Sequence, residues 1–165
     1  MIISDTSVIT NLISIKHLFL LQKLYQKIII PQAVSEELAK SHSQLFDELQ
    51  QEEFAILEVR SVSDSKRVEE LQKQAKLDLG ESEAIVLALE LKTELLLIDE
   101  RRGRAEAQRL GIRITGFLGV LLEGKKRGFV VAIKPLMDQL IEDCTFRISS
   151  PLYNRILVLG REKDI

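Results

Sequence analysis

Two aspartates directly follow short apolar runs, at positions where a parallel sheet presents reactive side chains. Asp5 follows the run 2–4, and Asp99 follows the run 95–98. In an open parallel sheet, ligands bind beyond the carboxyl ends of the strands, near the point where the strand order reverses. We therefore expect both carboxylates at that edge. Each aspartate also has an alternative role as the cap of the helix after it, because Asp is a favoured N-cap residue.

A third acid, Glu37, follows the apolar run 28–31 within the first two turns of an expected helix. A side chain there reaches back towards the same edge of the sheet. Glu37 lies three residues after Val34 and therefore on the apolar side of the helix, whereas its neighbour Glu36 leans towards solvent. We expect Glu37 to join the two aspartates, with an ordinary surface glutamate as the alternative.

The segment 78–84 contains three acids. Asp78 and Glu81 have the spacing of a capping box, in which each side chain accepts from the backbone of the other. Glu83 has no such task and lies beside the apolar face of the helix, where a carboxylate needs a partner or a metal. We place Glu83 ahead of Glu81 as a metal ligand and keep Glu81 as a second candidate.

A group of carboxylates without histidine or cysteine suits a hard cation such as Mg²⁺ or Mn²⁺. The two histidines, His17 and His42, show no zinc-ligand spacing with the single cysteine. Mutual repulsion among the acids would raise at least one pKa unless a cation neutralised them. The expected ligands are Asp5, Glu37, Glu83 and Asp99.

Short apolar runs alternate with stretches of helical period, which is typical of an α/β chain with a mainly parallel sheet. Unbroken runs such as 95–98 suit a sheet that helices cover on both faces. We expect a three-layer α/β/α domain. The expected strands are 2–3, 28–30, 55–57, 95–98 and 112–114. The expected helices are one broken or two short ones in 8–25, then 33–41 with Pro31 in its first turn, 63–76, 81–91, 117–128, 132–143 and 151–159 with Ser150 as its cap.

The length of 165 residues, with 45% apolar and 29% charged residues, suits one globular domain. The net charge of −2 argues against a protein that coats long nucleic acids. From Asp99 to Arg127, however, eight basic residues face four acidic ones, a local balance of +4. This region suits a phosphate backbone, or it is simply a set of solvated helix faces.

The chain offers no intramolecular disulfide, because Cys144 is its only cysteine. Its first ten residues lack the basic start and long apolar run of a secretory signal. The longest apolar runs are far shorter than the ~20 residues that span a bilayer. We expect a cytoplasmic protein without a membrane segment.

Four motifs together resemble those of PIN-domain proteins, in particular the VapC-like toxin ribonucleases of prokaryotic toxin–antitoxin pairs. They are I-S-D-T-S at 3–7, P-x-A-V-x-x-E-L at 31–38, G-E-x-E-A-I-x-x-A at 80–88 and L-L-L-I-D-E-R-R at 95–102. The resemblance extends from residue 1 to about residue 122. It implies a single PIN-like domain over 1–165, with a core of 1–122 and a helical extension of 123–165.

The resemblance implies a five-stranded parallel sheet and a metal-dependent endoribonuclease that acts on single-stranded RNA and leaves a 5′-phosphate. It assigns the metal to Asp5, Glu37, Glu83 and Asp99, and it departs from the toxins at Glu83, where they usually carry Asp. It also implies a supporting hydroxyl at Thr6 or Ser7, with a helix cap as the alternative for Ser7. Arg101 and Arg102 are expected to hold the scissile phosphate, or else to be solvated surface residues.

Two rival functions remain open at this point. One is a PIN-like module that binds nucleic acid or a partner without cutting. The other is a phosphatase with a strand-end aspartate nucleophile, although Asp5 lacks the second aspartate two residues on that such enzymes use.

Partners are RNA and, by resemblance, an antitoxin. The C-terminal helices either cover the core or form a homodimer face, through Leu136, Leu140, Ile141, Leu152, Ile156, Leu157 and Leu159.

Overall fold

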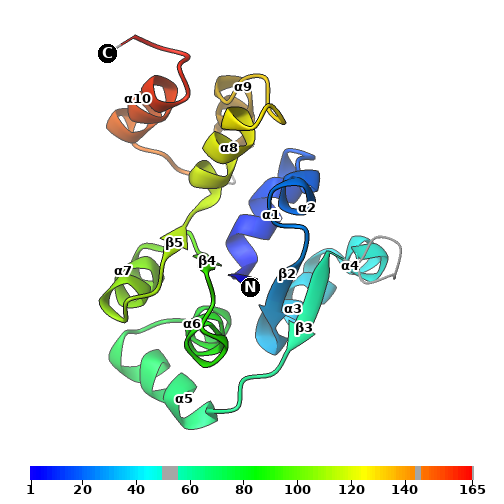
Figure 1. Cartoon of the computed structure of the whole chain (residues 1–165), viewed down its shortest axis with the longest axis vertical. Coiled ribbons are helices and arrows are strands. Elements are labelled where there is room, and N and C mark those ends of the chain that lie inside the picture. The colour runs from blue at the N-terminus through cyan, green and yellow to red at the C-terminus, as the bar shows by residue number, and fades with distance from the viewer. Residues whose placement is uncertain (50–55, 144–145, 165) are drawn as a thin grey trace.

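The fold is built on a sheet of five parallel strands in the order β3-β2-β1-β4-β5 (Figure 1). The computed structural model describes residues 1–49, 56–143 and 146–164. The strands are β1 (Ile2–Ser4), β2 (Ile28–Pro31), β3 (Leu57–Arg60), β4 (Leu95–Leu97) and β5 (Ile114–Thr115). All five expected strands are present. β5 begins two residues later than expected, and position 55 of the third expected strand lies outside the described residues.

The strand order reverses between β1 and β4, which are neighbours in the sheet but far apart in sequence. Ile3 of β1 is in register with Leu96 of β4. Just past β1, the backbone N–H of Asp5 donates to the carbonyl of Leu97 at 2.9 Å. The chain segments that leave β1 and β4 therefore start side by side, at the place where an open parallel sheet binds its ligands.

The described helices agree with most of the expected ones. They are α1 (Thr6–Ser14), α2 (Phe19–Tyr25), α3 (Gln32–Ser41), α4 (Ser43–Leu49), α5 (Ser65–Gln74), α6 (Leu79–Leu91), α7 (Arg101–Arg109), α8 (Phe117–Lys126), α9 (Lys134–Glu142) and α10 (Ser150–Leu159). The sequence did not predict α4, and it gave no bounds for α7, although a helix after Asp99 was one of the alternatives. The cap of α10 is Ser149 rather than Ser150, because the Ser149 side chain accepts from the Leu152 N–H at 3.3 Å. None of the described helices combines the length and the apolar character that a membrane-spanning helix needs.

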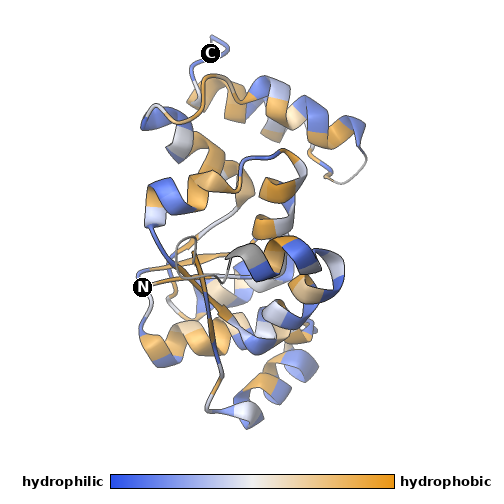
Figure 2. Cartoon of the chain, turned by 90° about the vertical axis from the view of Figure 1, so that its right-hand side faces the viewer, coloured by the Kyte–Doolittle hydropathy of each residue, from blue (hydrophilic) through white to orange (hydrophobic). Residues whose placement is uncertain are grey.

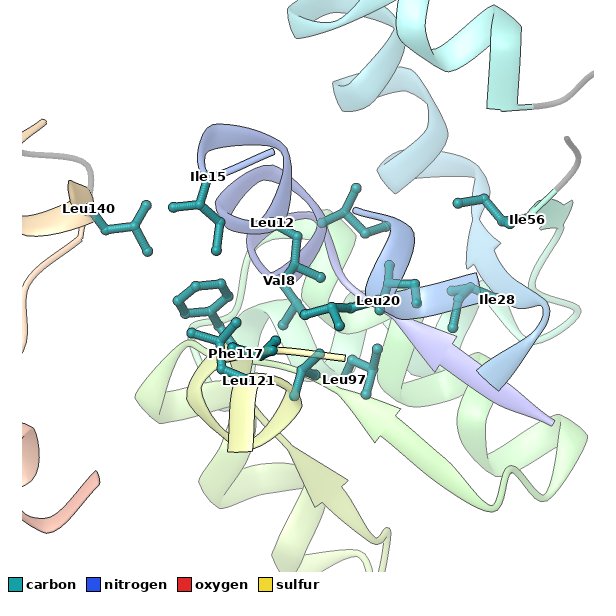
Figure 3. Packing of buried hydrophobic residues seen from close by; sticks show 14 of the residues in the cluster. Val8, Leu12, Ile15, Leu20, Ile28, Ile56, Leu97, Phe117, Leu121 and Leu140 are labelled. Carbon is teal, nitrogen blue, oxygen red and sulfur yellow. The ribbon is translucent and has the colours of Figure 1, made fainter. Parts of the chain in front are cut away.

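The helices cover both faces of the sheet, which confirms the three-layer α/β/α architecture. Alternate residues of a strand point to opposite faces: Ile28 and Leu97 belong to one buried cluster, and Ile29 and Leu96 to the other. The first cluster includes residues of α1, α2 and α8 (Figure 3), and the second includes residues of α5, α6 and α7. Figure 2 shows the strands as mainly apolar segments that cross the middle of the molecule.

The C-terminal helices pack into the same core as α1. Met137 and Leu140 of α9 and Ile156 and Leu157 of α10 are buried in the first cluster. This confirms that these residues cover the core. Ile141, Leu152 and Leu159 are exposed, and a homodimer face there stays a prediction. The expected division of the chain at residue 122 falls inside α8, and that division also stays a prediction.

Candidate metal centre

Asp5 lies at the reversal of the strand order and is both a helix cap and a free acceptor. Its side chain is only 2% exposed. One oxygen, Oδ1, accepts from the Val8 N–H at 3.5 Å, so Asp5, and not Ser7, caps α1. The other oxygen, Oδ2, is buried and has no hydrogen-bond partner in the described part of the chain. Asp5 can therefore cap α1 through Oδ1 while Oδ2 remains available to a ligand, so the two roles that the sequence left open for Asp5 are compatible.

A small cavity of about 40 Å³ lies against Asp5. Its lining is almost wholly polar and comes from the starts of α1 and α6 and from the middle of α3: Asp5, Thr6, Ser7, Glu37, Asp78 and Glu81. The Thr6 hydroxyl, like Asp5 Oδ2, is buried without a hydrogen-bond partner among the described residues. We call this space the acidic cavity. It is large enough for one water molecule or one ion.

The capping box predicted at the start of α6 is confirmed. The Glu81 N–H donates to Asp78 Oδ1 at 2.8 Å, and the Asp78 N–H donates to Glu81 Oε2 at 3.2 Å. Glu81 is 8% exposed and lines the acidic cavity as well. Its capping bond uses one of its two oxygens. The capping task therefore does not remove Glu81 from the candidate ligands.

Glu37 reaches the acidic cavity from α3 because residue 80 is a glycine. A Cβ atom placed on Gly80 would lie 2.8 Å from Glu37 Oε1 and 3.5 Å from Cγ2 of Val34. Any larger residue at position 80 would push the Glu37 carboxylate away from α6. The expectation that Glu37 rather than Glu36 lies at this edge agrees with the lining of the cavity.

Two carboxyls of the acidic cavity, Asp5 and Glu81, have raised pKa values. Burial raises the pKa of Asp5 well above its ordinary value, and the nearby Asp99 carboxylate raises it further. Burial also raises the pKa of Glu81, against the lowering effect of its hydrogen bond to the Asp78 backbone, and Glu37 adds to the rise. The expected rise in pKa is therefore present, with burial as its first cause and repulsion between acids as an additional one.

Asp99 lies beside the acidic cavity rather than in its lining. Its Oδ1 accepts from the Phe117 N–H at 2.7 Å, and its Oδ2 accepts from the Asn11 amide at 3.4 Å. Burial raises the pKa of Asp99, while the Phe117 hydrogen bond and the Arg104 guanidinium oppose that rise. Asp99 thus caps α8. The helix that directly follows it, α7, is capped by Glu100, which accepts from the Arg102 N–H at 2.7 Å.

Glu83 is on the other side of α6. Two residues turn a helix by about 200°, so Glu81 and Glu83 face in opposite directions. Glu83 Oε1 accepts from the Ala33 N–H at 3.0 Å, at the start of α3. The premise that Glu83 has no capping task was therefore wrong, and the structure does not bring Glu83 to the acidic cavity. The acid that α6 does contribute is Glu81.

The two arginines expected to hold a phosphate lie exposed in the first turn of α7. Arg101 lines a hollow of about 440 Å³ together with Asp99 and Arg104, and Arg102 is not part of that lining. Sequence reasoning missed Arg104, which is half-buried and donates to the Ile98 carbonyl at 2.9 Å. Arg104 is three residues after Arg101, and residues with this spacing are neighbours on the surface of a helix. This spacing could have identified Arg104 as a second phosphate-binding candidate from the sequence.

The residues of the acidic cavity fit a hard divalent cation by their donor chemistry. The ligand atoms are all oxygens, and a buried carboxylate oxygen, Asp5 Oδ2, lacks any partner in the described part of the chain. Within the described part of the chain, however, no three side chains of His, Cys, Asp or Glu lie close enough together to hold a metal ion. A three-ligand group at Asp5 would therefore require the Glu37 carboxylate, which no capping bond among the described residues holds, to shift towards Asp5 and Glu81.

Comparison with protein families agrees with the fold. The profile of the family DUF3368, a PIN domain, matches residues 1–162. The match includes α8 to α10 and so extends beyond residue 122, where the sequence resemblance was expected to end. Neither the comparison with curated proteins nor the comparison with solved structures gives a match. The matched family, the five-stranded parallel sheet and its two helical layers together show that the chain belongs to the PIN-domain family, whose fold is of the nuclease type.

Proposed function

We propose that the chain is a metal-dependent endoribonuclease that hydrolyses phosphodiester bonds of single-stranded RNA. Asp5, Glu37 and Glu81 would hold Mg²⁺ or Mn²⁺, with Asp99 beside them. The observation that carries the proposal is the Asp5 carboxylate, which is buried with one unpartnered oxygen where the strand order reverses. An unsatisfied buried polar group costs about 1–3 kcal/mol, and more when it is charged. A bound cation would remove that cost.

The chain's own residues would bind and orient the substrate. Arg101 and Arg104 would hold a backbone phosphate in the hollow beside Asp99. The hydrogen bond from Val8 fixes Asp5 Oδ1, so that Oδ2 stays directed away from the cap. A divalent ion at this site supplies an activated water and neutralises charge on the phosphate.

The test is cleavage of a labelled single-stranded RNA in Mg²⁺ or Mn²⁺ by the wild type and by Asp5→Asn. We expect the variant to lose at least about a hundredfold in rate, because it lacks the ligand charge. Asp64→Asn is the matched control: it makes the same change at the cap of α5, where Asp64 accepts from the Arg67 N–H at 3.0 Å, and it should cut at the wild-type rate. Equal cutting by wild type and Asp5→Asn would refute a nuclease at this site.

The second candidate is a PIN-like module that binds nucleic acid or a partner without cutting. Two observations favour it: the described acids do not stand in a ready three-ligand group, and Asp99 is held by Phe117 and Asn11. Retention of RNA on the protein in Mn²⁺ without cleavage, equally in wild type and Asp5→Asn, would support this alternative.

We further propose that the chain is the toxin of a toxin–antitoxin pair. The acidic cavity lies at the mouth of the sheet, where a basic segment of an antitoxin would block it. Induced expression should then arrest growth, and Asp5→Asn should abolish the arrest. Arrest by the variant at the same protein level would contradict a toxic nuclease.

A further inference from the structure

A second hollow, with a mixed polar and apolar lining, lies on the opposite side of α6 from the acidic cavity. Its volume is about 330 Å³. Its lining comes from the starts of α3 and α6, from one side of α5 and from the chain after β3, and it includes Gln32, Val62, Glu69, Gln72, Leu79 and Glu83. Because the chain enters it directly after β2 and β3, this hollow is at the same carboxyl edge of the sheet as Asp5. We call it the α5–α6 hollow.

The first turns of α6 form the wall between the two spaces. Asp78 and Glu81 line the acidic cavity, whereas Leu79 and Glu83 line the α5–α6 hollow. Leu79 and Glu83 are four residues apart and therefore share one face of the helix. A helix with its side chains is about 10 Å across. If an RNA strand is cut at the acidic cavity, as proposed, a neighbouring nucleotide would need to span only about the width of one helix to enter the hollow.

The charge of the α5–α6 hollow excludes a phosphate. Two glutamates, Glu69 and Glu83, line it, and no described residue of its lining is a lysine or arginine. A backbone phosphate would be repelled there, in contrast to the hollow beside Asp99, which Arg101 and Arg104 line. The occupant must therefore carry no negative charge where it enters, and hydrogen-bond donors on it would match the two carboxylates.

Glu83 is held in place as an acceptor. The Ala33 N–H donates to its Oε1 at 3.0 Å, which fixes the carboxylate against the start of α3. A carboxylate accepts at about four positions, so most of its capacity is left for a ligand. The amide of Gln72 in the same lining adds one donor group and one acceptor.

The hollow also has an apolar side and a limited size. Leu79 is 45% exposed although it lies in the first turn of a largely buried helix, and Val62 and Val68 lie in the same lining. A planar ring placed there would cover Leu79. Ligand pockets start at about 300 Å³, so this space suits one base with its sugar and nothing longer.

We propose that the α5–α6 hollow binds a guanine base of the RNA, with Glu83 accepting from the N–H groups of its Watson–Crick edge. The proposal rests on the proposed ribonuclease function and adds a base preference next to the cut. Guanine presents two adjacent donors to a carboxylate, N1–H and the 2-amino group. Cytosine and adenine each place a single amino group beside an acceptor, and uracil places one N–H between two carbonyls.

Binding of single nucleotides tests the hollow without any cleavage. The probes are the 5′-monophosphates of guanosine, cytidine, adenosine and uridine, titrated into the metal-free full chain and followed by backbone amide shifts of Ala33 and Glu83. We expect the guanosine nucleotide to bind at least about fivefold more tightly than the other three, the lower end of what one bidentate pair contributes. Because all four probes carry the same phosphate, the difference reports the base.

Glu83→Gln is the decisive variant. The glutamine amide oxygen still accepts from the Ala33 N–H, so the start of α3 keeps its cap, while its NH₂ group opposes the guanine donors. The guanosine preference should disappear. Glu70→Gln, the same change at an exposed residue of α5 outside the lining, should keep it. Leu79→Ala should weaken the binding of all four nucleotides by a similar factor. This result would separate the apolar contact, which every base makes, from the recognition of guanine by Glu83.

Cleavage of a random-sequence RNA completes the test. The wild type should enrich guanine at one fixed position beside the cut, and the cuts that Glu83→Gln makes should lack that enrichment. Cutting by wild type without guanine enrichment, or the same enrichment in Glu83→Gln, would overturn the guanine site alone. Guanosine binding that depends on Glu83 in a protein that cuts no RNA would support the site while overturning the nuclease proposal.

Discussion

Replacing Asp5 with asparagine should stabilise the metal-free protein. Asparagine caps helices as well as aspartate does, so the bond from the Val8 N–H is kept. What is removed is a negative charge on a side chain that is 2% exposed and lies near Asp99. The neutral asparagine NH₂ group would take the place of Oδ2 without a partner among the described residues, so the gain is only the extra cost of burying a charge. We expect the free energy of unfolding to rise by about 1–3 kcal/mol at pH 7.5. For a chain of this size, that corresponds to roughly 3–10 °C in Tm.

The stabilisation should grow with pH. Because the pKa of Asp5 is raised in the folded protein, the folded state holds this proton more tightly than the unfolded state does. The stability contributed by Asp5 is therefore fully present below its ordinary pKa of 3.8, and it is lost as the pH rises through the raised folded value. Asparagine does not titrate. The difference in unfolding free energy between Asp5→Asn and wild type should be small at pH 4 and largest near pH 8.

Bound metal should make wild type more stable than Asp5→Asn, the reverse of their order of stability without metal. A ligand that binds only the folded state stabilises it by about 2.7 kcal/mol at a hundred times its Kd. The free energy of unfolding of wild type should rise by this amount in Mn²⁺. That of Asp5→Asn should rise much less, because the variant lacks a charged ligand. The assay is urea denaturation from pH 4 to pH 8, in EDTA and in millimolar Mn²⁺.

The control for this series is Asp64→Asn. It makes the same change at the cap of α5, where the side chain is exposed, and its unfolding free energy should stay within about 0.5 kcal/mol of wild type. The reasoning is refuted if wild type in EDTA is more stable than Asp5→Asn at every pH, or if Mn²⁺ stabilises both proteins equally.

Two further substitutions act on the neighbours of the acidic cavity. Gly80→Ala should keep or raise metal-free stability, since alanine is favoured over glycine in helices by about 0.5–1 kcal/mol. Its Cβ would displace Glu37 Oε1, so the rise in Tm that Mn²⁺ causes should be smaller than in wild type. An unchanged rise in Tm would contradict a ligand role for Glu37. Arg104→Gln should cost about 1–3 kcal/mol through the weakened bond to the Ile98 carbonyl. Because it also lets the pKa of Asp99 rise further, the cost measured by urea denaturation should be larger at pH 8 than at pH 5, and equal costs would contradict that coupling.

The elements that the sequence predicted are those with a strong local signal. β2 and β4 are runs of large apolar residues between polar stretches, and α6 carries a capping box that is visible from spacing alone. The extent of α7 was not predicted for a physical reason: its buried residues are Gly103 and Ala107, so it has no stripe of large apolar side chains. These small residues let α7 lie close to the sheet, since a Cβ on Gly103 would be 2.7 Å from Cδ1 of Ile98.

The choice between Glu81 and Glu83 shows where elimination from sequence fails. Glu81 was set behind Glu83 because it had a capping task, yet that task occupies one oxygen and leaves the carboxylate in the lining of the acidic cavity. Glu83 looked unoccupied because its partner, the Ala33 N–H, is fifty residues away and no local pattern reveals it.

Asp5 shows the same principle as Glu81, since its cap fixes Oδ1 while Oδ2 stays unpartnered within the described residues. A cap restricts the rotation of a carboxylate, so it reduces the entropy that a ligand must lose when it binds a metal. Capping and metal binding are therefore cooperative roles for one side chain. In a parallel α/β protein, the acids that cap helices at the reversal of the strand order are the first candidates for ligands, and they should not be set aside because they already have a hydrogen bond.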